Sequence, residues 1–261
     1  MNYLYAPVGP FKFRYPLPEN WDELTIHQFR RIVRFSTKRF LKPEVADMML
    51  VKAITGASGS LFYFFDQSVI VYQALPLVEW AKGDNCHTTS LVPQLRTKFG
   101  LKLIGPSDRL AGVNVLAFGY ATAWLNTFTS NPTEDNLNCF IASLYHPRKR
   151  PFLKQKPFDG GDGWERDVRL ASYVRFEDKL MAAINFRGML AAMPTIFPVT
   201  YEEHGKKGVE VDWEVTVMGF TGEMPWEKSK IEEMEFTSIM AWIESKHVAA
   251  KELKRQIDLN K

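Results

Sequence analysis

The residues with the most distinctive chemistry lie in a basic run at positions 146–156. This run contains no acidic residue, and it places Phe152 among its cations and Tyr145 directly before it. Cations of this kind contact phosphate groups, and an aromatic ring between them can stack on a base. The candidate partner-binding residues are Arg148, Lys149, Arg150, Phe152, Lys154 and Lys156. The pattern fits nucleic acid and an acidic protein surface equally, and a solvated loop without a partner is the structural alternative.

Known metal-binding patterns do not accompany this run. Cys86 is followed by His87, and Cys139 precedes His146, but neither pair has the ligand spacing of a zinc site. The glycine-rich segment 159–163 begins with an aspartate, yet it lacks the oxygen ligands that an EF-hand needs at the later positions of its loop. The sequence therefore predicts no metal ion.

Motifs for phosphate binding and for a catalytic nucleophile are also missing from the sequence. Gly56 and Gly59 are not followed by the Gly-Lys-Ser/Thr of a phosphate-binding loop, and no Gly-x-Ser-x-Gly elbow occurs. The five histidines are scattered, and none lies near an obvious nucleophile. The sequence thus predicts a non-enzymatic protein without a cofactor. The alternative is an active site assembled from residues that are distant along the chain.

The composition is that of a globular protein with a sizeable core. Hydrophobic residues make up 46% of the 261 residues, whereas the net charge of +3 is too small to indicate nucleic acid by itself. No run of about 18 uncharged apolar residues occurs, so we predict no membrane span. The two cysteines do not make a disulfide framework, and no secretory signal is visible, so we expect a reduced, intracellular setting.

Two consecutive helices are expected at 113–145, and the rest of the chain is organised around them. In the second helix, apolar residues recur at helical spacing, which places them on one face: Leu137, Phe140, Ile141, Leu144 and Tyr145. Asn131 and Pro132 give its start signal, with Asn131 as the cap and Pro132 as the first helical residue. Pro147 ends it. The first helix, at about 117–128, carries Phe118 and Leu125 on one side.

Four further helices are predicted from caps and apolar spacing. One begins at Thr25, which forms a capping box with Gln28, and another runs from Pro43 to a stop at Gly56. A third spans 176–196 and is ended by Pro194 and Pro198. The last spans 237–257, with these apolar residues assigned to one side: Ile239, Trp242, Ile243, Ala250, Leu253 and Ile257.

Short strands are expected at 11–15, 99–104 and 209–213, where apolar and polar residues alternate. Residues 61–80 fit either a strand at 61–65 or a helix broken near Pro76. Together these patterns predict a mainly α-helical globular fold with a few short strands. We expect one domain over 1–261, and a subdivision near the irregular, glycine-rich segment 146–164 is the alternative.

Several short motifs occur in a characteristic order. Residues 21–25 (Trp-Asp-Glu-Leu-Thr) lead into a helix, and residues 108–110 (Asp-Arg-Leu) precede 118–120 (Phe-Gly-Tyr). Residues 142–147 (Ala-Ser-Leu-Tyr-His-Pro) follow, and Trp213 comes before a closing helix. In this order the chain resembles uncharacterised proteins carried by phages and prophages of Bacteroidetes, which are associated with tail or virion morphogenesis.

The resemblance implies a structural or assembly role, either as a tail-assembly chaperone or as a minor virion component. The expected partners are other proteins of the assembly, including further copies of the chain, and the expected location is the host cytoplasm or the virion. Nucleic acid bound through 146–156 is the alternative function.

Overall fold

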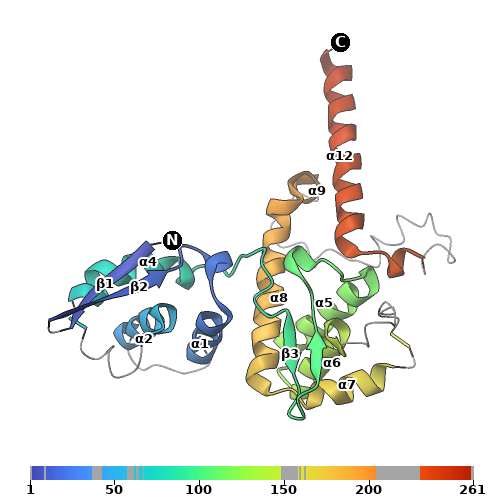
Figure 1. Ribbon diagram of the computed structural model, residues 1–261. Helices are drawn as coiled ribbons and strands as arrows, with labels where there is room; N and C mark the ends of the chain where they lie inside the picture. Colours follow the sequence, from blue (N-terminus) through green and yellow to red (C-terminus); the bar gives the residue numbers. More distant parts are fainter. Residues whose placement is uncertain are drawn as a thin grey trace.

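The computed structural model describes residues 2–8, 10–36, 43–57, 62, 65–66, 68–147, 158, 160–161, 163–203 and 230–259. The predicted strand 209–213 lies outside these residues, as do Arg148, Lys149, Arg150, Phe152, Lys154 and Lys156. The predicted fold class is confirmed, because the chain is mainly α-helical with short strands in two small sheets (Figure 1).

A first lobe contains the N-terminal third of the chain. Its elements are β1 (Asn2–Val8), β2 (Phe11–Leu17), η1 (Trp21–Glu23), α1 (Ile26–Ser36), α2 (Pro43–Thr55), η2 (Val69–Ala74), α4 (Leu75–Val78) and η3 (Glu79–Lys82). The predicted strand is β2, which pairs with β1 in an antiparallel hairpin that the sequence did not reveal.

Two local signals in this lobe are confirmed. The backbone N–H of Thr25 donates to Gln28 Oε1 (2.9 Å), and the N–H of Gln28 donates to Thr25 Oγ1 (3.2 Å), so the capping box forms at the start of α1. Gly56 follows the end of α2 with a φ of +70°, a conformation that favours glycine over every other residue.

The ambiguous segment is helical over residues 69–82. A π-helical turn, η2, leads into α4 and then into the 3₁₀ turn η3. The N–H of Leu75 donates to Ile70 O, five residues earlier, and Pro76 follows at once. The wider π turn accommodates the proline, whose ring and missing N–H would disturb a regular α-helix at this point.

A second lobe contains the central helices and the C-terminal helix. Its elements are β3 (Gln94–Arg96), β4 (Lys102–Ile104), η4 (Asp108–Leu110), α5 (Val115–Ser130), α6 (Glu134–Leu144), β5 (His146–Pro147), α7 (Trp164–Ser172), α8 (Phe176–Ile196), α9 (Pro198–Glu203) and α12 (Phe236–Leu259). Strands β3, β4 and β5 form a small antiparallel sheet in that order.

The central pair is confirmed as α5 and α6, which pack on each other and on α8 through buried rings such as Phe118, Phe140 and Phe186. The predicted cap of α6 is wrong by two residues. Thr133, not Asn131, has the extended backbone of a cap, and its hydroxyl accepts the N–H of Asn136. Asn131 instead ends α5.

The predicted helix 176–196 is confirmed with these bounds as α8, but Pro194 lies inside its last turn and does not end it. The proline removes one backbone hydrogen bond there, and only two residues of the helix follow it. Pro198 does not only stop a helix, since it opens α9 as the first residue of that helix. Helix α7 was not predicted.

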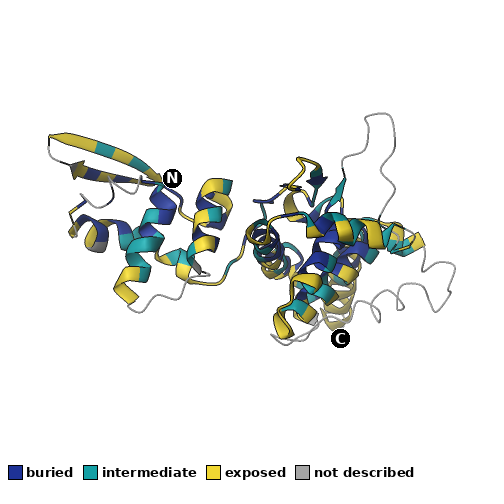
Figure 2. Cartoon of the chain, turned by 90° about the horizontal axis from the view of Figure 1, so that it is seen from below, coloured by how far each residue is buried: buried dark blue, intermediate teal, exposed yellow. Residues whose placement is uncertain are grey.

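Buried residues lie inside both lobes (Figure 2). The lobes meet where α1 packs against α8, and the buried residues belong to one hydrophobic cluster. Two ion pairs cross this junction. Arg30 binds Asp178 at 3.1 Å, and Arg34 binds Glu177 at 2.8 Å. The prediction of one domain over 1–261 stays a prediction.

Candidate functional site

The predicted basic site is described only at its N-terminal border. Tyr145, which directly precedes the run, is 2% exposed, and its hydroxyl donates to Val92 O at 2.8 Å. Burial raises the pKa of this phenol far above its usual range. The proposed pairing of Tyr145 with the cations as a stacking surface is therefore wrong, because its ring belongs to the core.

A different feature dominates the surface of the second lobe, the long helix α12, which projects from the body of the molecule (Figure 1). We call residues 234–243, at the start of α12 and just before it, the root of this helix, and the root is fixed to the second lobe. The N–H of Phe236 donates to Val113 O (2.8 Å), and the N–H of Val115 donates to Met234 O (3.0 Å). The ring of Phe236 stacks on that of Phe118 with a centroid distance of 3.7 Å.

Helix α9 contacts α12 about two turns beyond Phe236, at Glu244. The N–H groups of Val199 and Thr200 and the hydroxyl of Thr200 all donate to the carboxylate of Glu244, at 2.7–2.9 Å. Burial acts to raise the pKa of Glu244, but these hydrogen bonds outweigh it and lower the pKa below its usual value. Lys251 adds an exposed ion pair with Glu202 at 2.7 Å.

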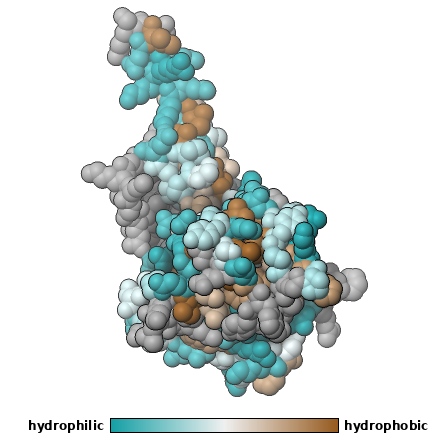
Figure 3. Space-filling model, turned by 90° about the vertical axis from the view of Figure 1, so that its left-hand side faces the viewer, coloured by the Kyte–Doolittle hydropathy of each residue, from teal (hydrophilic) through white to brown (hydrophobic). Residues whose placement is uncertain are grey.

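Beyond His247, every described residue of α12 is exposed. Large apolar side chains nevertheless continue along it: Trp242 is 51% exposed, Leu253 60% and Ile257 49%. Their spacing places these three on one side of the helix. Figure 3 shows hydrophobic patches along the projecting helix among hydrophilic residues.

The sequence had assigned six apolar residues of this helix to one side. The structure divides them, because Ile243 is buried at the root and Ile239 packs against the core, whereas Trp242, Leu253 and Ile257 face solvent.

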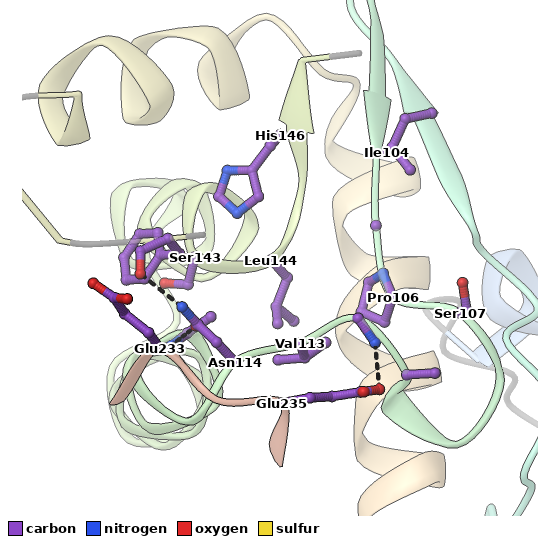
Figure 4. Close-up of a pocket in the computed structure, with 15 residues that line it drawn as sticks. Ile104, Pro106, Ser107, Val113, Asn114, Ser143, Leu144, His146, Glu233 and Glu235 are labelled. Atoms are coloured by element: carbon purple, nitrogen blue, oxygen red, sulfur yellow. Dashed lines mark hydrogen bonds between the residues drawn. The ribbon is translucent and has the colours of Figure 1, made fainter. Parts of the chain in front are cut away.

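A cavity of about 400 Å³ lies at the root of α12, between the start of α5, the end of α6 and the segment before α12 (Figure 4). Two of its polar side chains are committed to holding the backbone. Asn114 accepts the N–H of Ala117 and donates to Phe158 O, both at 2.8 Å. Glu235 accepts the N–H of Gly112 at 2.9 Å.

Among the described residues that line this cavity, His146 is the side chain best suited to acid–base chemistry. Its Nδ1 lies 3.7 Å from Asp167 Oδ2, an electrostatic contact that is too long for a hydrogen bond. Burial acts to raise the pKa of Asp167, but His146 and Arg166 together lower it, so the carboxylate is charged at neutral pH. The nearby hydroxyl of Ser143 donates to Cys139 O at 2.9 Å. Asp167 is not among the described residues that line the cavity, and no described hydroxyl nucleophile is aligned with His146.

The described residues contain no group of three or more His, Cys, Asp or Glu side chains placed to hold a metal ion. None of the described helices is long and apolar enough to cross a membrane. Cys86 and Cys139 are both free thiols. In comparisons with known proteins, no family model, curated protein or solved structure matches the chain.

Proposed function

We propose that this protein is a non-enzymatic assembly protein that binds another polypeptide through α12. The observation that carries the proposal is the contrast within this helix. Its root is fixed by buried side chains and backbone hydrogen bonds, whereas its outer half exposes Leu253 and Ile257 without a covering element in the described chain. Large exposed apolar groups on a rigid support are typical of a protein-binding surface.

The chemistry of the partner follows from the same residues. An apolar stripe on a helix is recognised by a hydrophobic groove or by the apolar face of a second helix. The outer half carries three cations, Lys251, Lys254 and Arg255, and two acids, Glu252 and Asp258, so its own charge is close to neutral. Apolar contact therefore supplies most of the free energy of binding. The mixed charges determine how the partner is aligned along α12.

We place this activity in phage tail or virion morphogenesis, as a tail-assembly chaperone or as a minor virion component. This setting rests on the motif resemblance. The residues of these motifs hold the fold together, as expected if the motifs recur in proteins with the same fold. Asp22 accepts the N–H groups of Thr88 and Thr89 at 2.7 Å, Phe118 supports the root of α12, and Tyr145 is buried.

Site-specific photo-crosslinking tests the proposal. A photoreactive phenylalanine at position 253 is compared with one at position 165, which is also exposed but lies on α7. In cells that assemble the particle, we expect position 253 to crosslink to one defined polypeptide and position 165 to give no such product. Light scattering after size-exclusion chromatography identifies the case in which the partner is a second copy.

The proposal fails if the protein is a strict monomer and position 253 captures no polypeptide during assembly. It also fails if positions 165 and 253 give the same products, since this would indicate nonspecific collision rather than binding by α12.

A further inference from the structure

A second cavity, of about 420 Å³, lies at the junction of the two lobes. Helix α1, strand β3 and the start of α8 form its walls. Its charged lining residues are Arg30, Arg96, Lys98, Arg175 and Asp178. This cavity is distinct from the one beside α12.

The charge in this cavity is strongly unbalanced. Among its described lining residues, four cations and one acid leave an excess of three positive charges. The acid, Asp178, is already engaged by Arg30 at 3.1 Å. Among the described residues, no carboxylate forms an ion pair with Arg96, Lys98 or Arg175. The cavity thus concentrates positive potential where an anion can enter.

Strand geometry keeps these cations together. Exposed and buried residues alternate along this segment, since Arg96 and Lys98 are exposed whereas Leu95 and Thr97 are buried. This alternation turns both cations to the same face of the extended chain. Arg96 also lies directly opposite Lys102 on β4. Like charges at opposed positions of a sheet destabilise it, and a bound anion would relieve that repulsion.

An exposed aromatic residue, Phe99, follows Lys98 in the chain and lies outside the described lining of the cavity. Phe99, next to Lys98, is 78% exposed at a turn where Gly100 has a φ of +82°. Its edge-to-face contact with Tyr173, at 5.1 Å between centroids, fixes its position and leaves most of its surface in solvent. Lys98 is anchored in the same way, because its N–H donates to Tyr173 O at 2.8 Å.

We propose that this cationic cavity, together with Phe99, binds single-stranded nucleic acid. Arg96, Lys98 and Arg175 contact phosphates, and Phe99, which follows Lys98 outside the described lining, stacks on an unpaired base where the strand leaves the cavity. Cations alone would suit any compound with phosphate groups. The exposed ring beside them favours a strand with accessible bases, because paired bases in a duplex offer no free face for stacking.

Fluorescence anisotropy with a labelled oligo-dT of about 20 nucleotides tests this proposal for the full chain. If three or four phosphates are neutralised, the logarithm of affinity falls with the logarithm of salt concentration with a slope of about −2 to −3. The double variant Arg96→Glu/Lys98→Glu should weaken binding at least about tenfold and flatten that slope. The matched control, Lys12→Glu/Lys230→Glu, changes charge equally at two exposed lysines that line neither cavity and should leave the affinity unchanged.

The variant Phe99→Ala tests whether the cavity binds nucleic acid or any small compound with phosphate groups. Loss of one stacked base should weaken oligo-dT binding roughly fivefold or more without altering competition by inorganic tripolyphosphate. Circular dichroism tests whether each variant folds. If Arg96→Glu/Lys98→Glu does not fold, Arg96→Gln/Lys98→Gln is used in its place. Oligo-dT binding that is absent, or unchanged in the Arg96/Lys98 variants, overturns the proposal. Tripolyphosphate that binds as tightly as oligo-dT, with no effect of Phe99→Ala, overturns it as well.

A variant with glutamine at positions 148, 149, 150, 154 and 156 distinguishes this cavity from the basic run. We expect it to retain most of the oligo-dT affinity. If it abolishes binding while Arg96→Glu/Lys98→Glu does not, nucleic acid binds at the run and the inference is overturned. None of these outcomes bears on binding by α12.

Discussion

Helices α8 and α12 are the two longest of the described helices, and they use their length in opposite ways. Helix α8 has 21 residues and buries ten of them, whereas α12 has 24 residues and buries three. In Figure 1, α8 runs through the second lobe beside α5 and α6, and α12 extends away from it. Polar residues lie inside along α8, and apolar residues lie outside along α12.

Each polar residue buried on α8 has a specific role in packing. Lys179 is fully buried, and its ammonium donates to Glu134 and, at 2.7 Å, to Asn138 Oδ1. Asn185 Oδ1 accepts the N–H of Leu91 at 2.8 Å and faces His87 Nε2 at 3.1 Å. If α12 binds a partner as proposed, α8 carries stability and α12 carries binding, so substitutions in the two helices should affect different measurements.

The largest expected effect comes from Lys179→Ala. It removes a buried side chain, leaves Asn138 Oδ1 without its donor and opens a cavity against α6. We expect the free energy of unfolding to fall by about 2–4 kcal/mol in urea denaturation. Lys179→Met keeps most of the volume and should recover at least about 1 kcal/mol of this loss. A fall of less than about 0.5 kcal/mol for Lys179→Ala would show that α8 does not depend on this contact.

Gly188→Ala should have the next largest effect. A Cβ at this position would lie 2.2 Å from His87 Cε1 and 2.7 Å from Asn85 Oδ1, so the buried ring must move. Overpacking of this kind destabilises by about 1–3 kcal/mol. Gly119→Ala in α5 is the matched control, because its Cβ would meet nothing within 4 Å. The control should stabilise by about 0.5–1 kcal/mol through helix propensity, and equal effects of the two variants would refute the clash.

A smaller effect is expected from the titration of His87. Burial lowers the pKa of this imidazole, although Asn185 and the charge of Asp22 act to raise it. The unfolded chain, with an ordinary pKa of about 6.5, therefore binds a proton that the folded chain resists. The free energy of unfolding should be greatest above that pH and should decrease as pH falls below it.

Denaturation midpoints measured between about pH 7.5 and 5.5 test this dependence, since the unfolded histidine titrates within that window. His87→Gln removes the titrating group and should give a flatter profile, although it is less stable throughout. If wild type and variant have the same slope, the titration of His87 contributes nothing to stability.

The sequence predicted those features that depend on neighbouring residues. Thr25 and Gln28 form their capping box because both partners lie within one turn, and Gly56 stops α2 because only its own φ matters. The apolar spacing in α5 and α6 likewise predicted which rings enter the core. The cap at Thr133 was missed because Asn131 and Thr133 are both competent caps, and the choice depends on how the chain leaves α5.

Features that depend on distant residues could not be predicted in this way. His87 was one of five scattered histidines, and its partner Asn185 lies 98 residues away. Arg96 and Arg30 come from different lobes, and β3 is only three residues long. For α12, the helical spacing of the apolar residues was predicted correctly. Spacing alone cannot distinguish Ile243, which is buried at the root, from Leu253, which faces solvent.

The smallest effect on stability is expected in α12, where Leu253→Glu/Ile257→Glu should change the free energy of unfolding by less than about 0.5 kcal/mol. Both side chains are about half exposed or more, so they contribute little to the folded core. The same variant should abolish the photo-crosslink formed when the reactive group is placed at position 242, because carboxylates in the stripe oppose an apolar partner. If stability falls instead by as much as in Lys179→Ala, α12 is a structural helix like α8, and the division between the two helices is wrong.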